Sequence, residues 1–231
     1  MSTKQPIDGE GNITTFLKQY FSGVLVGIIA STWVSTKAFA DSIESQPLLI
    51  FRILNPAQVP DEVLAQAKEH VQHIYRDSGI QIEWLEGDEA QQPFYGRKSL
   101  NLTIVLVSES VARTMGQENK ATGFAIGTDG RGARRAYVFA ERVERHAMSV
   151  HHQRSMEQKG AEGLILGHVI AHEAGHLMLP PDSHSPKGIM RAQMDMDCVD
   201  QDLGEALRGN LLFNSAQSKL IRTALLTQAG H

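Results

Sequence analysis

Two histidines stand four residues apart in the segment HVIAHEAGHLMLPPDSHSPKGIM, residues 168–190, and a glutamate follows the first of them. Side chains four apart on a helix lie on the same face, one turn from each other. His172 and His176 can therefore reach one metal ion, with Glu173 directed to the side where a metal-bound water would stand. This spacing is typical of a zinc site. Core-packed histidines are the alternative, because so short a pattern also arises by chance.

A catalytic zinc normally has three protein ligands and one open position, so a third ligand is needed. His168 continues the same helical stripe, but eight residues at 1.5 Å each place it roughly 12 Å from the last motif histidine along the axis. We assign it to packing or to an outer partner. Pro180-Pro181 predicts that the helix stops there, which lets the following loop turn back. We predict His184 as the third ligand, with Asp182 as the alternative.

The motif and a short downstream segment resemble the metzincin clan of zinc metallopeptidases: His172, Glu173, His176, His184 and Gly188-Ile189-Met190. That clan combines H-E-x-x-H-x-x-G-x-x-H with a methionine turn beneath the metal. The resemblance implies Zn²⁺ as the cofactor, Met190 as the turn methionine, and a mixed sheet whose edge strand, here 121–127, lines the cleft. It spans about residues 47 to 190, but only 172–190 is specific to the clan.

The chain departs from the clan's pattern at two positions. Leu179 stands where the clan has glycine, and His184 lies two positions after the standard third histidine. Asp182 occupies that standard position, and some clan members use aspartate there. The resemblance therefore leaves both residues open as the third ligand. Met194 and Met196 are alternatives for the turn methionine.

The expected chemistry follows from such a site. Three neutral imidazoles leave zinc its full charge and a position for water. Glu173 would act as general base toward the zinc-activated water, and then pass the proton to the leaving amine. We predict an exported zinc-dependent endopeptidase, a hydrolase acting on peptides or proteins. The alternatives are a non-catalytic zinc- or peptide-binding module of the same fold, and a gluzincin-type peptidase with Glu205 as a ligand.

The elements that must position these residues indicate an α+β fold. Alternating and continuous apolar runs predict strands, and apolar residues at helical spacing predict helices. Asp61 is expected to cap the first helix and Gly79 to end it. The predicted strands are 48–54, 80–84, 100–107, 121–127 and 136–140, and the predicted helices are 61–76, 141–157, 162–179 and 216–226.

These elements predict one mixed, twisted sheet of about five strands backed by two helices, since sequential strands usually lie next to each other. An active-site helix and a small C-terminal helical subdomain complete the zincin-like or metzincin-like arrangement that the resemblance implies. Histidines on other helices are predicted to lie on solvated surfaces and not to bind metal: His70, His73, His151 and His152.

Composition places the chain among single-domain globular proteins, with 231 residues, 42% hydrophobic and 21% charged. A net charge of −4 and the lack of a long basic run give no reason to expect a nucleic-acid partner. The densest basic segment, 131–145, is interleaved with Glu141 and Glu144 and is predicted to be a solvated face. Nothing in the sequence indicates the oligomeric state.

The N-terminal region predicts export. The apolar run FSGVLVGIIASTWV, residues 21–34, follows Lys18 and precedes Ala38-Phe39-Ala40, the order found in a secretory signal peptide. The run is shorter than the roughly 20 residues that a spanning helix needs. We therefore expect a signal peptide at 1–40 and one metallopeptidase domain at 41–231, secreted or periplasmic. An uncleaved segment would instead anchor the protein in a membrane. The single Cys198 cannot form an internal disulfide.

Overall fold

A computed structural model describes residues 47–85, 99–117, 121–127, 134–154, 158–192 and 211–228. Within these ranges, no helix is long and apolar enough to cross a membrane. Several predicted features lie outside the described residues: the segment 1–40, Met194, Met196, Cys198 and Glu205, and the side chains of His151 and His152.

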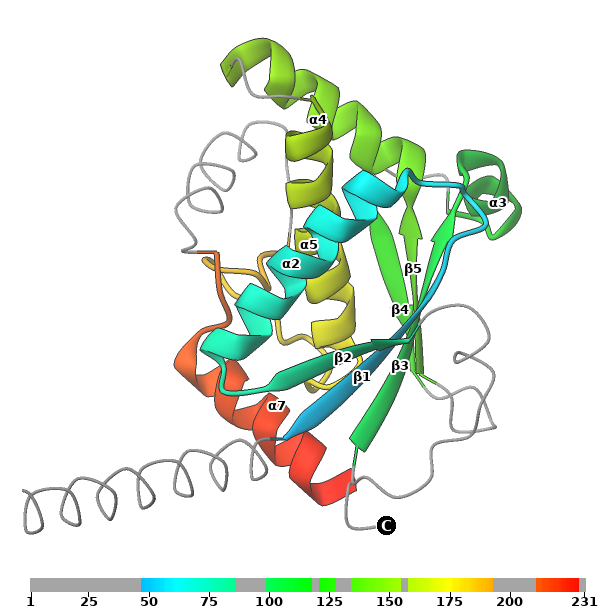
Figure 1. Cartoon of the computed structure of the whole chain (residues 1–231). Coiled ribbons are helices and arrows are strands. Elements are labelled where there is room, and N and C mark those ends of the chain that lie inside the picture. The colour runs from blue at the N-terminus through cyan, green and yellow to red at the C-terminus, as the bar shows by residue number, and fades with distance from the viewer. Residues whose placement is uncertain are drawn as a thin grey trace, which may run out of the picture. The chain divides into compact units, whose positions relative to one another are not determined.

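The described residues form an α+β arrangement with one five-stranded sheet, ordered β2-β1-β3-β5-β4 (Figure 1). Neighbouring strands are parallel except for β4, which lies at the edge and runs antiparallel to β5. The sheet is therefore mixed, as the order of elements predicts. The strands are β1 Leu48–Leu54, β2 Gln81–Leu85, β3 Ser99–Val107, β4 Gly123–Ile126 and β5 Arg134–Phe139, and the helices are α2 Asp61–Asp77, α3 Glu109–Thr114, α4 Ala140–Arg154, α5 Gln158–His176 and α7 Ser215–Gln228.

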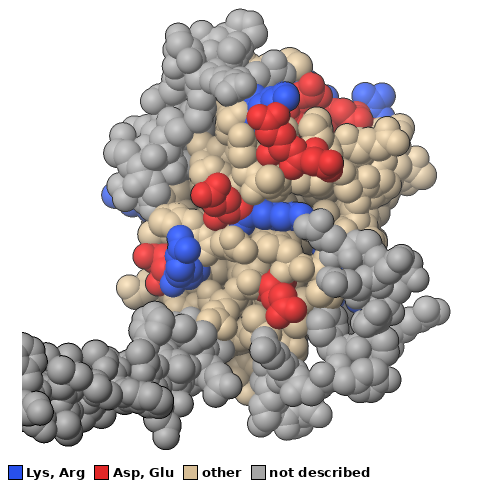
Figure 2. All heavy atoms as spheres, viewed as in Figure 1, with Lys and Arg blue, Asp and Glu red and all other residues tan. Residues whose placement is uncertain are grey.

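The main core lies between the sheet and the helices α2 and α5, which Figure 1 shows together on one face of the sheet. Alternate residues of β3 point into it, and Leu102, Ile104 and Leu106 are almost completely buried. The spacing of buried residues along α2 follows the helical period that the sequence predicts. Figure 2 shows both acidic and basic side chains on the face of the molecule that is seen in Figure 1. One such pair, Lys159 and Glu62 at 2.6 Å, joins α5 to α2.

Several predicted helix ends are shifted from the observed ones; α5, for example, begins at Gln158 and not at 162. Asp61 is not the cap of α2, because Pro60 holds that position and its carbonyl accepts from the amide of Leu64 at 3.0 Å. Asp61 lies in the first turn, where its negative charge still interacts favourably with the helix dipole. Helix α5 ends at His176 and not at 179, because the amides of Leu177 and Met178 donate to carbonyls three residues back, at 3.2 and 3.0 Å, in a tighter turn that precedes Pro180.

Helix α3 was not predicted from the sequence. Its signal is Ser108, whose hydroxyl accepts from the amide of Val111 at 3.5 Å and so caps the helix. The helix is only 6 residues long, too short to show a hydrophobic period.

Helix α7 packs beside the C-terminal end of α2 (Figure 1). The Phe213 ring contacts Tyr75 with centroids 5.2 Å apart, and the hydroxyls of Ser78 and Ser218 are 2.9 Å apart. The Arg222 guanidinium donates to the carbonyl of Ser78 at 2.7 Å. These contacts join the last described helix to the core next to the turn that follows α5.

Candidate metal centre

Three histidines converge at the C-terminal end of α5. His172 and His176 come from the helix and His184 from the turn after it, and one ring nitrogen of each lies within 4.8 Å of the others. The Nε2 atoms of His172 and His176 are 3.0 Å apart. Tetrahedral bonds of about 2.1 Å place ligand atoms roughly 3.4 Å from each other. The spacing therefore fits one metal ion between the three rings after a small adjustment.

A backbone contact determines which nitrogen of His172 is free to bind. Its Nδ1 lies 2.8 Å from the carbonyl oxygen of Ile189, which can only accept, so Nδ1 carries the hydrogen. The lone pair is then on Nε2, the atom that faces His176. Burial lowers the pKa of His172, and burial with the neighbouring histidines lowers the pKa of His176 to about 4. Both rings are neutral near pH 7, which is the form that binds metals.

Glu173 lies between α5 and the edge strand β4. Its side chain is only 6% exposed, and burial raises its pKa to about 8. A Cβ added at Gly123 of β4 would lie 2.9 Å from Cγ of Glu173 and 3.0 Å from its Oε1. The bare backbone of β4 thus makes room for this carboxyl. A metal dication beside it would favour the charged form and lower the pKa again.

Met190 packs against Gly175, in the helical turn between His172 and His176, and is completely buried. Its Sδ atom is 2.6 Å from where a Cβ at Gly175 would stand, so only glycine allows this contact within the H-E-A-G-H segment. The amide of Ser185 donates to the Met190 carbonyl at 2.8 Å, which closes the segment 185–190 immediately after His184. The structure thus places the turn that contains Met190 directly against the histidine helix.

Other residues considered as ligands lie apart from this group. His168 is buried and stacks on His70 of α2, with ring centroids 6.2 Å apart, and burial lowers its pKa to about 3. Asp182 is exposed, has φ of 60°, and is not among the converging ligand atoms that the described residues contain. His73 is exposed as expected, but His70 is half-buried against His168.

The basic segment 131–145 is not entirely a solvated face, because Arg142 is only 4% exposed. Its guanidinium donates to Glu109 at 2.8 and 3.0 Å, to the carbonyl of Ala121 at 2.7 Å, and to that of Gln117. The hydrogen bonds from Arg142 hold the pKa of Glu109 at about 2. Arg142 therefore fixes the chain just before β4, beside Glu173.

Two residues of the site were missed by sequence reasoning. Gly123 gave no signal, because only the packing of β4 on α5 shows that a side chain would not fit there. Gln217 had a sequence signal, since Asn214-x-x-Gln217 has the spacing of a capping box. Nothing in that pattern relates it to the histidines.

Comparison of the chain with known protein families, curated proteins and solved structures found no match.

Proposed function

We propose that this protein is a zinc-dependent endopeptidase with a metzincin-like arrangement. The observation that carries the proposal is the convergence of His172, His176 and His184 with an imidazole lone pair directed inward. The antiparallel edge strand beside the histidine helix and the methionine beneath it agree with such a fold. The N-terminal apolar segment supports export.

The donor set fits zinc, because three histidine imidazoles are a known catalytic ligand set that leaves one position open. When bound, zinc would act as a Lewis acid that acidifies water and polarises a substrate carbonyl. His172 is held for this role by the Ile189 carbonyl, an outer partner of the kind that orients metal-binding histidines.

Glu173 would handle the protons of the reaction. Its carboxylate takes a proton from the attacking water while the new C–O bond forms, and delivers it to the amine nitrogen as the C–N bond breaks. Burying a carboxyl that is only 6% exposed costs stability, and a catalytic role would explain why the protein carries that cost. A module that only bound peptides would not need this buried acid, so Glu173 favours catalysis over the binding alternative.

Purified full-length protein and its Glu173→Gln variant would be tested on a mixed peptide library, with and without a chelator. We expect cleavage that the chelator stops and zinc restores. The variant should lose at least about 100-fold in rate, since a general base contributes about 10²–10⁴-fold, yet it should retain bound zinc. Glu162→Gln on the same helix is the matched control and should remain active.

Each contrary outcome has a distinct meaning. Loss of zinc from Glu173→Gln in step with activity would make Glu173 a ligand and not a base. Zinc binding by a wild-type protein that cleaves nothing would support the binding module. Loss of zinc on substitution of Glu205 would support the gluzincin alternative.

A further inference from the structure

A buried glutamine at the start of α7 reaches the turn that carries His184. The Gln217 side chain is 5% exposed, and its Nε2 lies 3.1 Å from the carbonyl oxygen of Ser183 and 3.2 Å from the hydroxyl of Ser185. One contact is made on each side of His184. Its Oε1 accepts from the amide of Asn214 at 3.0 Å.

The partners determine the orientation of this amide group. The Asn214 N–H can only donate and the Ser183 carbonyl can only accept, so oxygen faces the former and nitrogen the latter. The Ser185 hydroxyl accepts from Gln217 while it donates to the Lys187 carbonyl at 2.7 Å. Both amide hydrogens are therefore used to hold the segment 183–185.

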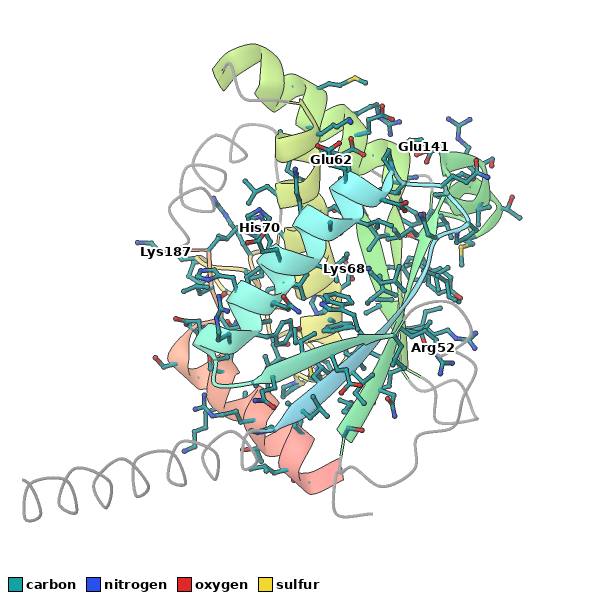
Figure 3. All side chains as sticks on the ribbon, in the orientation of Figure 1. Arg52, Glu62, Lys68, His70, Glu141 and Lys187 are labelled. Atoms are coloured by element: carbon teal, nitrogen blue, oxygen red, sulfur yellow. The ribbon has the colours of Figure 1, made fainter. Side chains whose placement is uncertain are left out.

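His184 has little support from regular structure. It lies eight residues beyond the last residue of α5, and its side chain is exposed. Figure 3 shows Lys187 of the same turn pointing away from the sheet. The hydroxyl contacts of Ser183 with Pro180 and of Ser185 with Lys187 stay within the turn. The amide of Gln217 instead ties this turn to a helix that packs on the core.

We propose that Gln217 is a positioning residue of the metal centre, which holds the turn so that His184 meets His172 and His176. A ligand on an unrestrained loop would have to be ordered when metal binds, and that ordering weakens affinity. Partners around metal ligands typically contribute about 10–100-fold in affinity. The role rests on the proposed metal centre, and it makes α7 part of that centre.

Gln217→Glu separates this role from helix capping. The glutamate side chain has the same size as glutamine. Its carboxylate still accepts from the backbone N–H of Asn214, as glutamate does in a capping box. It has no hydrogens for Ser183 or Ser185. We expect about tenfold or greater loss of zinc affinity in a chelator competition, with faster zinc release. The metal-free variant should also unfold more easily, because its carboxylate replaces two hydrogen bonds at a position that is 5% exposed, so zinc affinity is compared under conditions where both proteins are folded. The Co²⁺-substituted variant should show an altered visible spectrum, because one ligand is less firmly held.

Asn214→Ala is the matched control. It removes the side-chain oxygen of Asn214, which accepts from the backbone N–H of Gln217 at 2.9 Å. The side chain of Gln217 can still bind the turn. This variant should lower stability by about 1 kcal/mol while zinc affinity stays within about twofold of wild type. If Gln217→Glu does not fold, Gln217→Met takes its place with the same expected loss of zinc affinity.

Equal zinc affinity of Gln217→Glu and wild type would overturn the role of Gln217 alone. An equal loss in Asn214→Ala would also overturn it, because the effect would then come from helix stability. Failure of the wild-type protein to bind zinc would overturn the metal centre itself, and the role of Gln217 with it.

Discussion

At the scale of single residues, the three proposed ligands are held to very different extents. His172 is fixed by a hydrogen bond to Ile189, and His176 is half-buried in the last turn of α5. His184 is exposed on a turn, and its ring lies edge-on to His176 with centroids 4.7 Å apart. The third ligand is therefore the one whose contribution depends most on its surroundings.

We predict that His184→Ala lowers zinc affinity by more than about 100-fold, because loss of a direct ligand should exceed the 10–100-fold cost of losing an outer partner. His168→Ala should leave zinc affinity nearly unchanged, since the His168 ring stacks on His70 and is not one of the three proposed ligands. Chelator competition measures both. Asp182→Ala is the control that distinguishes the two candidates for the third ligand. If Asp182→Ala loses zinc while His184→Ala retains it, Asp182 is the third ligand and not His184.

At the scale of elements, the site depends on the close approach of β4 to α5. Gly123 faces Glu173, and Ala121, two residues before β4, is held by Arg142 through its carbonyl. The strand therefore serves as one wall of the space that holds the Glu173 carboxyl.

Gly123→Ala should lower kcat by at least about tenfold with zinc retained, because a displacement of about 1 Å can cost about 10²-fold in rate. The added Cβ would lie 2.8 Å from the Tyr137 carbonyl and 2.9 Å from Cγ of Glu173, so strand and carboxyl must both shift. Gly127→Ala, just after the same strand, meets nothing within 4 Å and should behave as wild type. Unchanged kcat in Gly123→Ala would show that the carboxyl tolerates the shift.

At the scale of the whole molecule, stability should depend on groups buried where α2 and α5 pack together. His168 is 6% exposed between these helices, and burial lowers its pKa to about 3. The unfolded chain binds a proton at this histidine near pH 6.5, whereas the folded protein does not until about pH 3. Its contribution to stability is therefore fully present above pH 6.5 and is lost as the pH falls toward 3.

We predict that His168→Leu unfolds with a weaker pH dependence than wild type between pH 6.5 and 3. The difference should be on the order of a few kcal/mol, since each unit of pKa shift corresponds to about 1.4 kcal/mol. Denaturant unfolding of the metal-free proteins measures it, so that zinc loss in acid does not contribute. The exposed His73→Leu serves as control, and parallel curves for wild type and His168→Leu would refute the prediction.

The sequence by itself determined the local elements and the chemistry that the site contains. The predicted strand at 48–54 has the observed bounds of β1, and the helix predicted at 61–76 differs from α2 by one residue. Both follow from apolar periodicity and turn residues, which act over a few neighbours. The pair His172 and His176 on one helix face is equally local. Short or atypical signals failed, as α3 and the early end of α5 show.

Only the tertiary structure decided what surrounds those residues. Gly123 meets Glu173, and Gln217 meets Ser183, across 50 and 34 positions of the chain. Such contacts depend on the strand order and on where α7 packs, and no spacing along the sequence encodes them. The turn that brings His184 to the two helical histidines differs, because Pro180-Pro181 predicted it, and the structure decided only between His184 and Asp182 as the residue that faces them. Side-chain type and local period are properties of a segment, whereas burial and partners arise from the packing of distant segments into one core.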